Sequence, residues 1–187
     1  MCYLTLGLLL WTSIHLFPSI AKGTRENIVN KIGLGPYKGM FAILIVSSVV
    51  LIVLGWRSTE PVEVYMPPAW GRHTTFVLVL FTFILFVAAR RKTNLKRILR
   101  HPQLTGLVLW GIGHLLANGD NRSVVLFSWL TIWAIVEMLM INRREGNWVK
   151  PGAVLVKSDV ITVIGGCLLY VILLMAHPYF SGIRLIQ

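Results

Sequence analysis

The chain has 187 residues, of which 56% are hydrophobic and only 13% are charged. Soluble domains average about 25% charged residues, so this composition excludes an ordinary soluble domain and indicates an integral membrane protein. The net charge of +11 does not indicate binding to nucleic acid, because the basic residues lie between long apolar runs, where they set membrane topology.

Six apolar runs predict six transmembrane helices. A helix needs about 20 mainly apolar residues to cross a bilayer, and the third run is slightly short of that length. The predicted spans are residues 2–21, 39–56, 74–89, 102–119, 123–142 and 160–183. We therefore expect an all-α membrane bundle that forms a single domain over residues 1–187.

The basic residues predict the orientation of the bundle. Segments 22–38, 90–101 and 143–159 contain 14 of the 18 basic residues, and the other four are Arg57, Arg72, Arg122 and Arg184. The positive-inside rule places the three basic segments in the cytoplasm and both termini outside. Part of the second segment, residues 91–100, is expected to form a short amphipathic helix on the inner leaflet.

The two most informative residues are His15 and His114. Each is the last residue but one of the same frame, L-x-L-W-x-x-x-H-L, in which Trp11 and Trp110 lie one helical turn before the histidines. A membrane interior does not solvate an imidazole, so a histidine there needs a hydrogen-bond partner, a pore or a metal. Two such histidines favour a metal cofactor held between two helices, while the simpler alternative is that each bonds a neighbouring carbonyl.

The repeated frame also suggests internal symmetry. It recurs after 99 residues, on the first and fourth predicted spans, which run in opposite directions across the membrane. This arrangement predicts a 3+3 inverted repeat. His15 and His114 would then be offset by about 10 Å along the membrane normal. Trp11 and Trp110 share a helix face with their histidines and could wall a flat macrocycle.

Several motifs resemble the NnrU family, bacterial membrane proteins linked to denitrification and nitric oxide metabolism. These motifs are Gly35-Pro36-Tyr37-Lys38-Gly39, Pro67-Pro68-Ala69-Trp70, Arg72-His73, Arg100-His101-Pro102-Gln103, Leu109-Trp110 and His114-Leu115-Leu116-Ala117-Asn118-Gly119-Asp120. The resemblance runs from about residue 4 to residue 145. It implies a multi-pass protein of the bacterial cytoplasmic membrane.

The family is similar to the plant 15-cis-zeta-carotene isomerase, a membrane enzyme in which two histidines coordinate haem b. The resemblance places those ligands at His114 and His15. Gly111 stands where the isomerase has a cysteine implicated as an alternative ligand, so a thiolate switch is absent at that position. The resemblance therefore implies a haem b protein of nitric oxide metabolism; the alternatives are a carotene cis-trans isomerase or a non-catalytic accessory factor for nitrogen-oxide respiration.

Other polar residues could serve the same cofactor. Arg100, His101, Tyr37 and Lys38 could gather around haem propionates at the inner interface, and His101 is a reserve axial ligand. His73 and His177 fall at the outer ends of spans, where histidines are commonplace. Asp120 and Arg122 could shape an outer entrance near His114. The expected partners are the lipid bilayer, haem and a small apolar or gaseous substrate.

Overall fold

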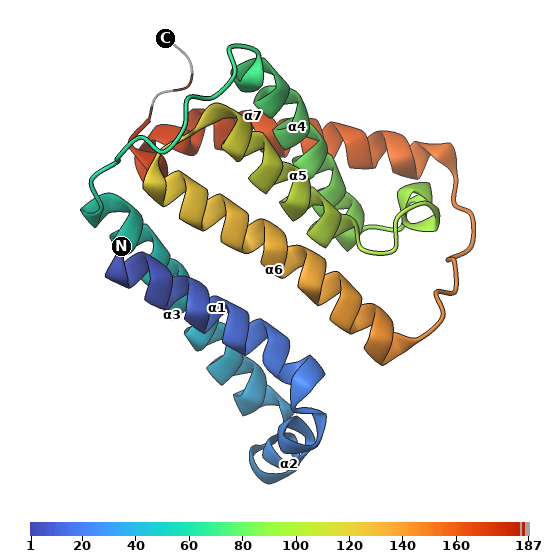
Figure 1. The fold of residues 1–187 in the computed structure, drawn as a ribbon. Helices are drawn as coiled ribbons and strands as arrows, with labels where there is room; N and C mark the ends of the chain where they lie inside the picture. The colour runs from blue at the N-terminus through green and yellow to red at the C-terminus, as the bar shows by residue number, and fades with distance from the viewer. Residues whose placement is uncertain (184, 186–187) are drawn as a thin grey trace.

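The computed structural model describes residues 1–183 and 185, and this part of the chain is all-α (Figure 1). It contains seven α-helices and one short 3-10 helix; the only β pairing there is an isolated bridge between Glu63 and Asp120. The elements are α1 (Cys2–Ile20), α2 (Lys22–Ile32), α3 (Leu34–Ser58), α4 (Gly71–Arg90), η1 (Asn94–Arg97), α5 (Pro102–Ala117), α6 (Asn121–Glu145) and α7 (Val156–Ser181).

Five of these helices are long and apolar enough to cross a membrane, namely α1, α3, α4, α6 and α7. The fourth predicted span is also helical, but α5 contains only 16 residues. At 1.5 Å per residue it is about 24 Å long, shorter than the hydrocarbon core of about 30 Å. The structure therefore supports a multi-pass membrane protein and does not confirm a sixth full span.

The structures of two basic segments, 22–38 and 91–100, differ from those expected from the sequence. Most of the basic segment 22–38 is helical, because α2 fills residues Lys22–Ile32 and α3 begins at Leu34. Gly33 separates the two helices at a φ of 86°, a conformation that glycine adopts without strain. The prediction of an amphipathic helix over residues 91–100 is wrong in extent, since only the short helix η1 forms there. Thr93 and Asn94 instead bond Asp159 of α7, which fixes this segment in place.

Helix α6 lies between two groups of helices (Figure 1). On one side α1 packs against both α3 and α6; on the other side α5 packs against α6 and α4, and α4 packs against α7. The α4–α5 contact is reinforced by the hydroxyls of Thr75 and Thr82, which donate to the carbonyls of Gly113 (2.6 Å) and Gly106 (2.9 Å). Small residues and hydroxyl bonds of this kind join helices inside membranes.

Both ends of the described chain lie at the same end of the bundle. The amino group of Met1 donates to Thr59 Oγ1 (2.6 Å), and Arg57 of α3 donates to the carbonyl of Tyr179 near the end of α7 (2.9 Å). The side of the membrane that this end faces stays a prediction. Arg184, one of the basic residues counted for topology, lies outside the described residues.

The inverted repeat is not confirmed. It would relate the α1–α3 pair to the α5–α6 pair, and both pairs do pack together. The same symmetry requires a contact between α7 and α1 that corresponds to the extensive α4–α5 contact. Helices α7 and α1 are not among the well-packed pairs of the described chain. The repeat therefore stays a prediction.

The α1–α3 contact depends on the absence of a side chain at Gly7. A Cβ added there would lie 2.8 Å from the backbone nitrogen of Ile52 and 2.8 Å from the carbonyl oxygen of Ser48. We expect Gly7→Ala to lower the stability of the protein in detergent by about 1–3 kcal/mol through overpacking. Thermal unfolding followed by circular dichroism measures this change.

Gly39→Ala is the matched control, because a Cβ at Gly39 on α3 would have no atom within 4 Å. That substitution should be neutral or stabilise the helix by up to about 1 kcal/mol. Equal melting temperatures for the two variants would contradict the close packing of α1 on α3.

Candidate functional site

The ring of His114 is held within its own helix. Its Nδ1 lies 2.8 Å from the carbonyl oxygen of Trp110, and the ring stacks on Phe127 of α6 with a centroid separation of 4.5 Å. A carbonyl oxygen only accepts hydrogen bonds, so Nδ1 carries a proton and donates it. In the neutral ring Nε2 then keeps a lone pair, the state in which histidine binds a metal.

His15 repeats this local geometry on α1. Its Nδ1 donates to the carbonyl of Trp11 at 2.9 Å, and its ring lies against Trp11 (4.1 Å between centroids) and Trp133 of α6 (5.0 Å). The simpler alternative, in which each histidine bonds a neighbouring carbonyl, is thus confirmed for both frames. The bond is compatible with metal binding, because it involves only one ring nitrogen.

His114 faces a cavity of about 420 Å³ between α3, α4, α5, α6 and α7. Apolar and aromatic side chains make up most of its walls, and polar residues lie among them. The apolar and aromatic group includes Phe76, Val79, Phe83, Trp110, Phe127, Tyr170 and Leu173, and the polar group includes Arg72, Asn118, His177 and Ser181. This volume lies within the range of about 300–1,000 Å³ found for small-molecule and cofactor sites.

The two histidine frames lie in separate surroundings. Trp110 and His114 line the cavity together, whereas Trp11 and His15 are absent from its lining. His15 lies among the aromatic rings of α1, α3 and α6, including Phe41. Because α6 stands between α1 and α5, the structure brings each tryptophan to its own histidine. His15 and His114 do not line a common cavity among the described residues.

The four residues expected at the inner interface do not form one group. Arg100 and His101 line a polar surface opening near Trp148, where Arg100 donates to the carbonyl of Gly146 (2.8 Å) and His101 Nε2 bonds Asn142 Oδ1 (2.8 Å). Tyr37 is buried on α3 beneath the guanidinium of Arg25 (5.6 Å), and Lys38 is exposed. None of these four lines the cavity beside His114.

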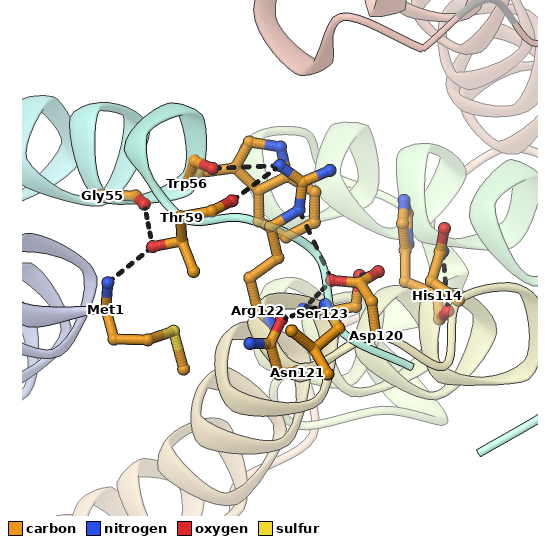
Figure 2. A network of polar contacts seen from close by, with 11 residues as sticks. Met1, Gly55, Trp56, Thr59, His114, Asp120, Asn121, Arg122 and Ser123 are labelled. Atoms are coloured by element: carbon orange, nitrogen blue, oxygen red, sulfur yellow. Dashed lines mark hydrogen bonds and ion pairs between the residues drawn. The ribbon is translucent and has the colours of Figure 1, made fainter. Parts of the chain in front are cut away.

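A polar network supports the α3 wall of the cavity (Figure 2). Arg122 lies over the Trp56 ring (4.5 Å to its centroid) and donates to the carbonyls of Trp56 (3.2 Å) and Thr59 (3.3 Å). Asp120 pairs with Arg122 at 3.4 Å and accepts from the backbone nitrogen of Ser123 at 3.1 Å, which caps α6. Trp56 lines the cavity, so Asp120 and Arg122 fix its wall rather than forming an entrance themselves.

The connection before α4 closes over the end of α5. The hydroxyl of Tyr65 donates to the carbonyls of Leu115 and Asn118, the second at 3.0 Å, and so satisfies acceptors that the helix end leaves open. Burial and the negative charge of Asp120 raise the pKa of Tyr65. The hydroxyl therefore stays protonated, and remains a donor, throughout the physiological range.

Sequence reasoning gave little weight to two residues of the cavity, His177 and Arg72. From the sequence, His177 is expected only at a membrane interface, and Arg72 is expected only to affect topology and to form part of a family motif. In the structure both line the cavity with His114, and Ser181 Oγ lies 2.8 Å from His177 Nδ1. No local sequence pattern predicts that these residues lie together, because their grouping depends on the packing of α7 against α4.

A family model described as NnrU protein matches residues 3–185, nearly the whole chain. The chain belongs to the NnrU family. The match extends past residue 145, where the recognised motifs end, and includes α7 with His177. No curated protein and no solved structure matches the chain.

The polar network around Asp120 is expected to stabilise the fold. Asp120→Ala removes both the cap of α6 and the partner of Arg122, so we expect a loss of about 0.5–2 kcal/mol. Glu60→Ala is the matched control, because Glu60 is an exposed acid of the α3–α4 connection, next to Thr59 of the network. Thermal unfolding in detergent measures both variants, and an unchanged melting temperature for Asp120→Ala would contradict the assigned cap.

Proposed function

We propose that the protein binds haem b in the cavity beside His114, with Nε2 of His114 as the iron ligand. The observation that supports this most strongly is the bond from His114 Nδ1 to the Trp110 carbonyl, in a ring that lines an apolar aromatic cavity. Metal-ligating histidines usually donate their other ring nitrogen to a carbonyl or carboxylate, which fixes the tautomer and orients the ring.

The donor set of the cavity suits haem better than a bare metal ion. Among the described residues, no three His, Cys, Asp or Glu side chains are placed to hold a metal together. A porphyrin supplies four nitrogens of its own, so a single imidazole suffices to anchor it. The aromatic rings of Phe76, Phe83 and Trp110 give the cavity walls that accept a flat macrocycle.

Haem held by one imidazole offers an open coordination position for a small redox ligand such as nitric oxide. We therefore propose a role in nitric oxide or denitrification metabolism, in the bacterial cytoplasmic membrane, as the family resemblance suggests. His177 is the second imidazole at this cavity, whereas His15 as second ligand stays a prediction from sequence. The protein's residues would orient the haem through His114 and exclude water with apolar walls.

The same apolar walls support a second candidate, a carotene cis-trans isomerase, because a polyene is also a flat apolar molecule. Conversion of a cis-carotene to its trans isomer by the purified protein would favour this function. A shift of the haem spectrum on addition of nitric oxide would favour gas chemistry.

The spectrum of the protein purified from a haem-replete host tests the proposal. We expect a b-type haem in the reduced-minus-oxidised spectrum, and we expect His114→Ala to remove most of it because the iron loses its ligand. His73→Ala is the matched control, since His73 lies at the same end of α4 as Arg72 but does not line the cavity. A colourless wild-type protein would contradict haem binding and favour an accessory role.

His15→Ala decides between the two arrangements of ligands. Because His15 does not line the cavity, we expect this variant to keep most of the haem. Loss of haem from His15→Ala as complete as from His114→Ala would contradict the single-histidine site and support the paired ligands predicted from the sequence.

A further inference from the structure

We propose that the haem propionates face the end of the cavity that Arg72 lines, and that the Arg72 guanidinium binds one of them. This inference rests on the proposed haem function, and it assigns the orientation of the cofactor. It places the carboxylates at the opposite end of the bundle from Tyr37, Lys38, Arg100 and His101, where the sequence suggested them.

The cavity has one polar end. Arg72 is the second residue of α4, Asn118 follows the last residue of α5, and Ser181 is the last residue of α7. Arg72 is the one lining residue with a permanent charge among those described. Beyond Thr75, whose hydroxyl is bonded to the Gly113 carbonyl, the lining residues of α4 are apolar. They end at Phe83, which lies about 16.5 Å from Arg72 along the helix axis. An occupant with an apolar body and an anionic edge matches this distribution.

The iron ligand lies at the right depth for this orientation. Thr75 donates to the carbonyl of Gly113, so the residue next to His114 lies beside Thr75. Thr75 is three residues beyond Arg72, or about 4.5 Å deeper along α4. A porphyrin centred on iron near His114 would therefore bring its edge within the reach of the long arginine side chain.

The side chain of Arg72 lies at the cavity wall. Its guanidinium lies 5.9 Å from the centroid of the Phe76 ring, another lining residue, and donates to the carbonyl of Leu185 at 2.6 Å. A guanidinium has five N–H donors in a planar fork that matches a carboxylate, and this bond uses one of them.

The basic residues at the other end have different partners. Arg100 donates to the carbonyl of Gly146 and pairs with Glu145 at 3.7 Å, outside the cavity that contains His114. Because an ion pair with a propionate requires contact and Arg100 does not line this cavity, we do not expect Arg100 to hold the haem that His114 would ligate.

Titration of the haem-free full chain in detergent with haemin and with haemin dimethyl ester tests the inference. The ester keeps the porphyrin and iron but lacks the carboxylates. We expect Arg72→Gln to weaken haemin binding about tenfold or more, as for the loss of a charge-assisted hydrogen bond, and to leave ester binding unchanged. Arg57→Gln is the matched control, since Arg57 lies at the same end of the bundle and does not line the cavity.

The outcomes separate this inference from the function on which it rests. If the wild-type protein and Arg72→Gln bind haemin with equal affinity, the inference is overturned and the proposed haem binding is left intact. Equal weakening for haemin and its ester would also overturn it, because Arg72 would then act only on the shape of the cavity. Loss of haemin binding in Arg100→Gln instead would place the propionates at the inner end. Wild-type protein that binds neither compound would reject the proposed function and the inference together.

Discussion

The hydrogen bond from His114 Nδ1 to the Trp110 carbonyl fixes the chemistry available at the cavity. A bilayer provides no water to satisfy a buried imidazole, so the ring must find a donor or acceptor within the protein. By bonding the carbonyl four residues earlier on α5, the ring satisfies one nitrogen without leaving its helix. Stacking on Phe127 holds the ring plane, and the second nitrogen is then the atom that can bind a ligand.

Helix α6 determines which residues can share a ligand. Phe127 of this helix contacts His114 and Trp110 on one side, while Trp133 contacts His15 and Trp11 on the other. The same frame thus produces two similar histidines that face different neighbours. Only the His114 side joins α4 and α7, whose packing creates the cavity, and only there do the imidazoles of His114 and His177 and the Arg72 guanidinium line one space.

The sequence predicted the features of the fold and the site that depend on local residue patterns. The apolar runs identified the five long helices, the motifs identified the family, and the spacing of Trp110 and His114 placed both on one face, because residues four apart lie one turn apart in a helix. It could not predict the grouping of Arg72 and His177 with His114, which depends on contacts between distant helices. It also missed α2, whose polar sequence carries no membrane signal, and it extended the fourth span past Ala117, where Asn118 leaves the helix.

Rescue of a cavity variant by free imidazole tests the central claim most directly. In His114→Gly the space of the missing ring would be open to imidazole from solution, which would take the place of the proposed iron ligand. The account predicts that imidazole restores the b-type haem spectrum of His114→Gly, with saturable binding, and that His15→Gly needs no rescue. Failure of imidazole to restore the spectrum of a folded His114→Gly protein, or rescue required only at His15, would contradict iron ligation by His114.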